Sequence, residues 1–325
     1  MFKKTASFAK FVLLGAAFAG AQLCAASEYP NKPIKMVIPY TPGGSIDTVG
    51  RMVADQLQRQ LGQPIVIENL PGASGVLGSL NVKKAKADGY TLLFNASSQV
   101  YMPLVVAKKT YDAEQDFTPV GQIGYVPLLV AVNNDVPAKN LGEFAALVRA
   151  NPGKYTWATS GLGTTSHLSE EMINRALKLN MEIIAYKGAI PQLTDVVGGH
   201  VSAAVSPMPG VRSFVQGARL RAIAITSKTR VASMPDVPTV AESGIPGFEL
   251  LSWYGIWGPA GMPEAVTNRL NSEIAKAVDT PALKAKFTEL SFVPAKSNPE
   301  QFRKLIREDL SKIGQAVKEA NIRID

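Results

Sequence analysis

Short apolar runs alternate along the chain with stretches in which apolar residues recur every three or four positions. The runs lie at residues 34–38, 64–68, 90–94, 128–132, 182–186 and 220–226. Between the first two runs, apolar side chains follow the spacing of a helix that packs on a sheet: Ile46, Val49, Val53, Leu57 and Leu61. This repetition of strand, loop and helix predicts an α/β fold.

The C-terminal part predicts two helices that begin at Pro263 and Pro299, because apolar residues recur at helical spacing after both prolines. No Gly/Ser-rich linker divides the chain, and its length exceeds what one core of typical size supports. We therefore expect two lobes joined by crossing strands near residues 125–132 and 250–257. The predicted bounds are 27–126 with 253–325 for the first lobe and 127–252 for the second.

Residues 1–26 have the order of a signal peptide. Basic residues precede an apolar run over residues 11–21, and small residues follow it. We expect cleavage near Ala26 and export to the periplasm. A lipid anchor at Cys24, which is the single cysteine, would need a small residue before it, where Leu23 stands. The mature chain would then be soluble and without a disulfide.

The charge of the chain argues against a nucleic-acid partner. Its formal net charge is +8, to which the lysines of the predicted signal peptide contribute. The other basic residues are scattered along the chain and are not gathered with aromatic residues. This distribution favours a general attraction for anionic solutes over a surface that binds nucleic acid.

The loop at residues 39–47 is the first candidate binding site. It joins a predicted strand to a predicted helix through Gly43 and Gly44. Glycines allow a ligand oxygen to approach the backbone closely, and the first turn of a helix favours negative charge, so a carboxylate or phosphate fits here. The alternative is a tight turn that Ser45 caps.

The segment at residues 159–167 is the second candidate, because hydroxyl groups and glycines again precede a predicted helix. Such a segment supplies hydrogen-bond donors without fixed charge. The alternative is that Ser166 caps the helix while His167 points to solvent.

Two further polar loops follow predicted strands, at residues 95–99 and 186–189. The carboxyl ends of strands in an α/β sheet form the usual binding crevice, so these loops and the first two candidates indicate one shared site. Lys187 could neutralise an acid group there or could be an ordinary exposed lysine.

The residue inventory argues against catalysis. The chain has two histidines and no HExxH or CxxC pattern, so a metal or cofactor is not expected. The stretch at residues 72–75 lacks the spacing of the GxSxG elbow of a serine hydrolase. The hydroxyls, amides and glycines that dominate the candidate loops bind ligands well but transfer protons poorly near neutral pH.

Several long motifs in order give the chain a specific resemblance over its whole predicted mature length. They are YPNKPIKMVIPYTPGGSIDTVGR, VIENLPGASGVLGS, ADGYTLLF, SGLGTTSHL, YKGAIPQLTDVVGGHV, MPDVPTVAESGIPGFE and WYGIWGPAGMP. With these motifs the chain resembles the Bug (TctC-like) family of periplasmic solute-binding proteins that serve tripartite tricarboxylate transporters. The resemblance implies a Venus flytrap of type II-like topology, with two α/β lobes that close on a ligand carboxylate.

The resemblance also implies a set of ligand-binding residues. In the first lobe they are Tyr40, Thr41, Gly43, Gly44, Asp47, Ser97 and Ser98. In the second lobe they are Ser160, Gly161, Thr164 and His167, with Tyr186, Lys187, Ser206 and Met208 near the distal end of the ligand. An apolar wall would come from Tyr40, Tyr101, Met208, Trp253 and Tyr254.

The expected ligand is an aliphatic dicarboxylate or an aromatic acid. An amino acid is disfavoured, because Ser202 and Ser206 stand where many relatives carry aspartates that could pair with an ammonium group. We expect a monomer whose partners are membrane transporter subunits. The alternatives are a sensor that presents the closed clamp to a receptor and, less favoured, a hydrolase.

Overall fold

A computed structural model describes residues 29–319 and 321–323. The predicted signal peptide lies outside these residues. All six apolar runs identified in the sequence lie in strands, and the helices predicted after Pro263 and Pro299 are α9 (Glu264–Asp279) and α11 (Pro299–Glu319). The sequence patterns did not indicate helix α10 (Pro281–Glu289) or the short edge strand β11 (Val293–Pro294).

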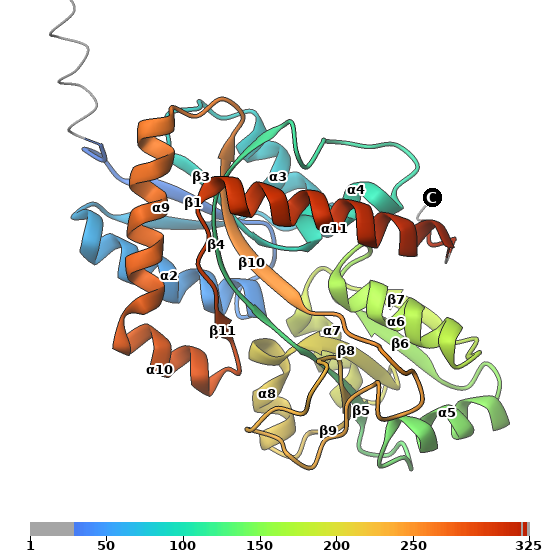
Figure 1. The fold of residues 1–325 in the computed structure, drawn as a ribbon. Helices are drawn as coiled ribbons and strands as arrows, with labels where there is room; N and C mark the ends of the chain where they lie inside the picture. Colours follow the sequence, from blue (N-terminus) through green and yellow to red (C-terminus); the bar gives the residue numbers. More distant parts are fainter. Residues whose placement is uncertain (1–28, 320, 324–325) are drawn as a thin grey trace, which may run out of the picture.

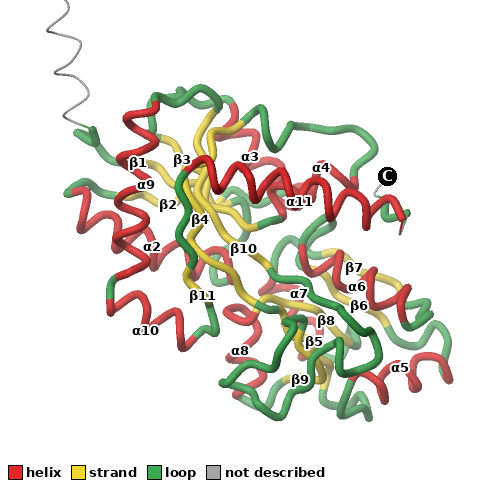
Figure 2. Tube along the Cα trace, viewed as in Figure 1, coloured by secondary structure: helices red, strands yellow, loops and turns green. Residues whose placement is uncertain are grey.

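A six-stranded sheet forms the framework of the lobe that we call lobe 1 (Figures 1 and 2). Its order is β11, β4 (Phe117–Val126), β10 (Ser252–Pro259), β3 (Thr91–Ala96), β1 (Ile34–Ile38) and β2 (Ile65–Asn69). Strands β1, β2 and β3 are parallel, and β10 runs antiparallel to both β3 and β4.

Helices cover both faces of this sheet, so its strands are apolar on both sides. Helices α2 (Ser45–Leu61), α9 and α10 pack on one face, where Met36 and Phe94 lie in their core. Helices α3 (Val76–Lys83), α4 (Ser98–Val105) and α11 pack on the other, where Val37 and Leu93 are buried. A one-turn 3₁₀ helix at Ala73–Gly75 precedes α3.

A five-stranded sheet forms lobe 2. Its order is β7 (Glu182–Ala185), β6 (Thr156–Thr159), β8 (Ala203–Pro207), β5 (Leu128–Asn133) and β9 (Leu220–Ile225). Helices α5 (Leu141–Ala150) and α6 (Thr165–Ala176) cover one face. Helices α7 (Ala189–Val197) and α8 (Met208–Gln216) cover the other.

Two adjacent segments cross between the lobes, which confirms the crossing strands expected from the sequence. Strand β4 ends at Val126 and β5 begins at Leu128, so Pro127 alone separates the two sheets. On the return, the Leu250 N–H still donates to the Thr226 carbonyl in lobe 2 (3.1 Å), and Ser252 pairs with Val126 in lobe 1. We infer from this division that the lobes separate at Pro127 and near Leu251.

Helix α11 fastens the crossing strand β10 to lobe 1. The Phe302 ring is fully buried between Trp253 and Trp257, at centroid distances of 5.6 and 5.1 Å. The Asp309 carboxylate accepts hydrogen bonds from the Tyr101 hydroxyl (2.6 Å) and the Trp253 indole N–H (2.5 Å). Tyr101 and Trp253 therefore face α11 rather than a ligand.

Across residues 29–319 and 321–323, the structure contains no helix with the length and apolar character needed to traverse a bilayer.

We expect Phe302→Ala to lower the free energy of unfolding by about 3–5 kcal/mol, because it leaves a cavity beside two tryptophans. Urea unfolding of the mature chain measures the effect. The matched control is Leu77→Ala, whose side chain is 56% exposed and should change stability by less than about 0.5 kcal/mol. Equal stability of the two variants would show that α11 does not hold β10 through this ring.

Candidate functional site

A pocket lies between the lobes, at the carboxyl ends of two pairs of parallel strands. In lobe 1, neighbouring strands β1 and β3 lead into α2 and α4 on opposite faces of the sheet. In lobe 2, neighbouring strands β6 and β8 lead into α6 and α8, again on opposite faces. Each lobe therefore opens a crevice where ligands of α/β proteins usually bind, and the two crevices face each other.

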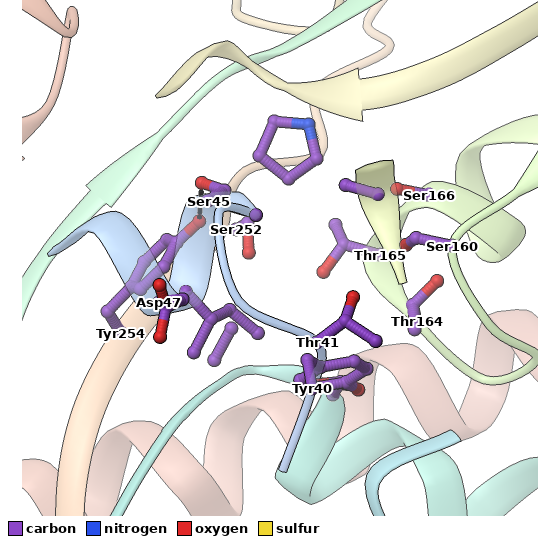
Figure 3. Close-up of a pocket in the computed structure, with 16 residues that line it drawn as sticks. Tyr40, Thr41, Ser45, Asp47, Ser160, Thr164, Thr165, Ser166, Ser252 and Tyr254 are labelled. Atoms are coloured by element: carbon purple, nitrogen blue, oxygen red, sulfur yellow. Dashed lines mark hydrogen bonds between the residues drawn. The ribbon is translucent and has the colours of Figure 1, made fainter. Parts of the chain in front are cut away.

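Most residues that line the pocket carry a hydroxyl group, although most of the lining surface is apolar (Figure 3). Its empty volume is about 490 Å³, which includes space open to solvent. Hydroxyl groups come from Tyr40, Thr41, Ser45, Ser98, Ser160, Thr164, Thr165, Ser166, Ser252 and Tyr254. The other lining residues are Gly44, Ile46, Asp47, Ala96, Ala189 and Pro207. Among the described residues, Asp47 is thus the one charged residue in the lining, which includes no lysine or arginine.

The Asp47 carboxylate is buried and fully engaged. One oxygen accepts from the Gly43 backbone N–H and the Arg51 guanidinium, and the other accepts from the Asn69 side-chain amide, all at 2.9 Å. Burial alone would raise the pKa of Asp47, but the hydrogen bonds from Arg51, Gly43 and Asn69 outweigh it and hold the pKa below its usual value. Asp47 therefore stays ionised, and hydrogen bonds engage both of its oxygens.

The same network fixes the loop that begins α2. Besides Asp47, the Asn69 amide donates to the Tyr40 carbonyl (3.0 Å), and the Arg51 guanidinium donates to the Asn69 side-chain oxygen (2.8 Å). Gly43 takes a positive φ of 85°, which a side chain would disfavour. The Gly43 N–H donates to Asp47, so it is not available to a ligand.

Helix α2 begins without a side-chain cap, because its N-cap residue is Gly44. The alternative that Ser45 caps this helix is not what the structure shows: the Ser45 hydroxyl pairs with the Tyr254 hydroxyl at 2.5 Å. The first intrahelical bond runs from Thr48 N–H to the Gly44 carbonyl. The N–H groups of the first turn are thus left without helical partners beside the pocket.

Four more helices begin at the pocket. The N-cap residues are Ser97 for α4, Thr164 for α6, Gly188 for α7 and Pro207 for α8. Of these, Thr164 alone makes a side-chain capping bond, with the backbone N–H of His167. Five positive helix ends therefore converge on a pocket without a basic side chain, which favours an anionic ligand.

His167 lies behind the start of α6. Its side chain is buried, and its Nδ1 accepts a hydrogen bond from the Gly163 N–H (3.3 Å). Burial lowers the pKa of His167 to about 4, so the imidazole is neutral near pH 7. The alternative with Ser166 as the cap and His167 in solvent is therefore wrong, because Thr164 caps the helix.

The lobes touch along a seam beside the pocket. The Ser97 and Thr165 hydroxyls meet at 2.9 Å across the cleft. Glycines of lobe 2 lie against side chains of lobe 1 at two further points: a Cβ on Gly188 would clash with the Thr41 hydroxyl, and one on Gly163 would lie 2.7 Å from the Met102 sulfur. The structure is thus a closed arrangement that depends on bare backbone at these positions.

The structure brings seven of the predicted ligand residues into the lining. They are Tyr40, Thr41, Gly44, Asp47, Ser98, Ser160 and Thr164. Gly43, Ser97, Gly161 and His167 lie just outside it. Ser45, Thr165, Ser166 and Ser252 belong to the lining but were not predicted as ligand residues, whereas Pro207 belongs to the stretch of residues 206–208 that the resemblance placed at the pocket.

The distal residues suggested by resemblance lie farther from the pocket surface. The Tyr186 hydroxyl donates to Asp195 on α7 (2.7 Å), and Lys187 is exposed. Ser206 and Met208 are buried, and Met208 packs in the core of lobe 2. Within residues 29–319 and 321–323, no group of three or more His, Cys, Asp or Glu side chains could hold a metal ion.

Comparisons with known proteins agree with this geometry. A family model described as TctC, tripartite tricarboxylate transporter family receptor, matches residues 49–322. The chain is 34% identical to Protein BugT of Bordetella pertussis over 92% of each chain. It is similar to the structure of periplasmic binding protein BugD (TM-score 0.88, 31% identity, 91% of this chain and 99% of that one). It is also similar to R. palustris Rpa4515 with adipate (TM-score 0.89, 29% identity, 91% and 99%).

We expect Asp47→Asn to destabilise the fold at pH 7 and to do so less as the pH falls. The folded pKa of Asp47 lies below its unfolded value of about 3.9, so its contribution is complete above that value and is lost as pH falls through the folded pKa. Urea unfolding of both proteins at pH 7, 5 and 3 measures the difference.

Asp55→Asn is the matched control for this measurement. Asp55 pairs with Arg59 on the same helix at the same spacing, but its side chain is 51% exposed, so the loss should be small. A difference between wild type and Asp47→Asn that stays constant down to pH 3, or that equals the Asp55 effect, would contradict the assigned role.

Proposed function

Because this chain belongs to the TctC family of tripartite tricarboxylate transporter receptors, which are periplasmic solute-binding proteins, we propose that it captures a small carboxylate between its lobes and delivers it to membrane transporter subunits. The observation that carries the proposal is the convergence of five helix N-termini on a pocket lined by no basic side chain. The adipate in the similar Rpa4515 structure supports a carboxylate ligand.

The start of α2 is the proposed position of the first carboxylate. Its N–H groups replace the water that hydrates the anion, and the Ser45 hydroxyl in the same turn pairs with that of Tyr254. Neutral donors and helix dipoles hold a carboxylate with less Coulomb attraction than a buried arginine would supply. Such a site suits an anion that must be released to a transporter.

Closure would occur by rotation about the two crossing segments. Pro127 and the residues near Leu251 are where the chain passes from one sheet to the other, so small backbone changes there move one lobe as a body. In the open form both crevices are hydrated. The ligand stabilises the closed form because it contacts helix starts of both lobes.

The pocket supports binding without turnover. Asp47 is held ionised by three donors, and His167 lies behind the lining, so neither is placed to exchange a proton with a ligand.

We expect the mature chain to bind one carboxylate ligand per protein molecule, with a rise in melting temperature that grows with ligand concentration. Isothermal titration and thermal shift measure this against dicarboxylates, aromatic acids, amino acids and neutral sugars, and analysis of the ligand afterwards should find it unchanged. Binding of sugars or amines in place of acids, or a product of turnover, would overturn the proposal.

We expect Gly188→Ala to reduce ligand affinity by at least about tenfold, because the added Cβ meets the Thr41 hydroxyl and opposes closure. X-ray scattering should show less compaction on addition of ligand. The control is Gly153→Ala, which also replaces a positive-φ glycine but meets nothing within 4 Å. If both variants bind and close like wild type, this seam does not govern closure.

A further inference from the structure

A second seam joins the lobes away from the pocket. The Ser233 hydroxyl of lobe 2 and the Ser291 hydroxyl of lobe 1 lie 2.7 Å apart, and either one can donate to the other. Ser233 belongs to the segment that follows β9, and Ser291 lies between α10 and β11. We call this contact the rear seam. The contacts beside the pocket, made by Ser97, Gly188 and Gly163, are the front seam.

The crossing strands lie between the two seams. In lobe 1, the sheet order puts β11 on one side of β4 and β10, and the pocket strands β3 and β1 on the other. In lobe 2, β9 lies on one side of β5, and the pocket strands β8 and β6 lie on the other. Figure 1 shows α10 and β11 on one side of β4 and β10, and α4 and α6 on the other. A rotation about the crossing segments that opens the front seam therefore presses the rear seam together.

In lobe 1, the rear seam is fixed to the crossing strands. Phe292, which follows Ser291, is buried, and its ring lies 5.3 Å from that of Tyr254 on β10. It packs so closely on β4 that a Cβ on Gly124 would lie 2.3 Å from its ring. Because the Tyr254 hydroxyl pairs with Ser45, the same packing reaches the start of α2 at the pocket.

In lobe 2, the loop that carries Ser233 is braced. The Arg230 Nε donates to both oxygens of the Glu242 carboxylate (3.1 and 3.0 Å), and its Nη1 donates to the Pro235 carbonyl (3.1 Å). The Met234 side chain packs against the core of lobe 2. The loop is therefore held on its lobe and moves with it.

The small size of the two residues is what lets the lobes separate at the pocket. Ser233 is exposed and Ser291 is half-buried, so water competes for their hydrogen bond, which contributes little free energy by itself. A serine hydroxyl can turn aside when the two loops approach each other. A large side chain on a braced loop cannot, so it would resist the rotation that opens the pocket.

We propose that the rear seam limits how far the pocket opens, and that Ser233 and Ser291 thereby set ligand affinity from outside the pocket, through the population of the closed form. They are positioning residues, since neither lines the pocket. The effect on affinity rests on the proposed function, whereas the effect on the shape of the ligand-free protein does not depend on any ligand.

The first test adds bulk at the rear seam. We expect Ser233→Trp to make the ligand-free mature chain more compact than wild type in X-ray scattering. We also expect it to bind an acid at least about threefold more tightly in titrations with succinate, adipate and benzoate, because more molecules are already closed. The control is Ser311→Trp, which makes the same change at an exposed serine in a hollow lined by α4 and α11 alone.

The outcomes separate this inference from the proposed function. Ser233→Trp with the ligand-free compactness of wild type, or with unchanged affinity for an acid that wild type binds, overturns the inference. An equal change in the Ser311 variant also overturns it. If no acid binds any of the proteins, the proposed function fails, and the scattering of the ligand-free chains alone decides the inference.

A reversible cross-link gives a second test in one sample. The hydroxyls of Ser233 and Ser291 are close enough for a disulfide between cysteines at these positions, and the single native cysteine, Cys24, lies in the predicted signal peptide. We expect the oxidised Ser233→Cys, Ser291→Cys protein to be more compact without ligand than after reduction, and to bind acid about tenfold more slowly. Failure to cross-link, or equal compactness before and after reduction, would contradict the role of the rear seam.

Discussion

The pocket depends on the hydrogen bonds of the buried Asp47 carboxylate. A free negative charge beside an anion site would repel the ligand. The Asp47 carboxylate instead accepts hydrogen bonds from Gly43, Asn69 and Arg51. In return it holds the loop before α2 in a conformation that exposes the first-turn N–H groups. The loop therefore gains rigidity, while Arg51 supplies the compensating charge from outside the lining.

Rigidity of this loop matters because dipoles act over short distances. A helix start attracts an anion mainly within its first turn, so five starts contribute together only if each is fixed against the same small volume. In each lobe, neighbouring strands send their helices to opposite faces, and this places two starts at one sheet edge. Closure then brings the sheet edges of the two lobes together, and they can meet because Gly188 and Gly163 have no side chain.

The sequence predicted the parts of the site that one lobe builds alone. The loop from Tyr40 to Asp47 and the segment from Ser160 to Thr164 follow parallel strands, whose carboxyl ends share a sheet edge. Ser252 was not predicted as a ligand residue, and Tyr254 was expected only as apolar wall, although its hydroxyl pairs with Ser45 at the start of α2. Both lie on β10, which is far from α2 in the sequence and enters the lobe 1 sheet beside β3. Among the residues expected at the distal end of the ligand, Tyr186 donates to Asp195, a contact that the spacing of residues in the sequence does not predict.

The gap between β6 and β8 shows how lobe 2 keeps its crevice free of charge. These strands pair only as far as Ala158 and Ala204. Beyond that point the Val205 N–H donates to the Glu170 carboxyl of α6 (3.0 Å), and the Gln192 amide of α7 donates to the Ala158 carbonyl (2.6 Å). Burial raises the pKa of Glu170 well above its usual value, which favours its uncharged form. Glu170 lies one turn along α6 from Ser166, which lines the pocket, so a charged carboxylate there would oppose an anion in the pocket. The uncharged acid bridges the strand gap without that repulsion.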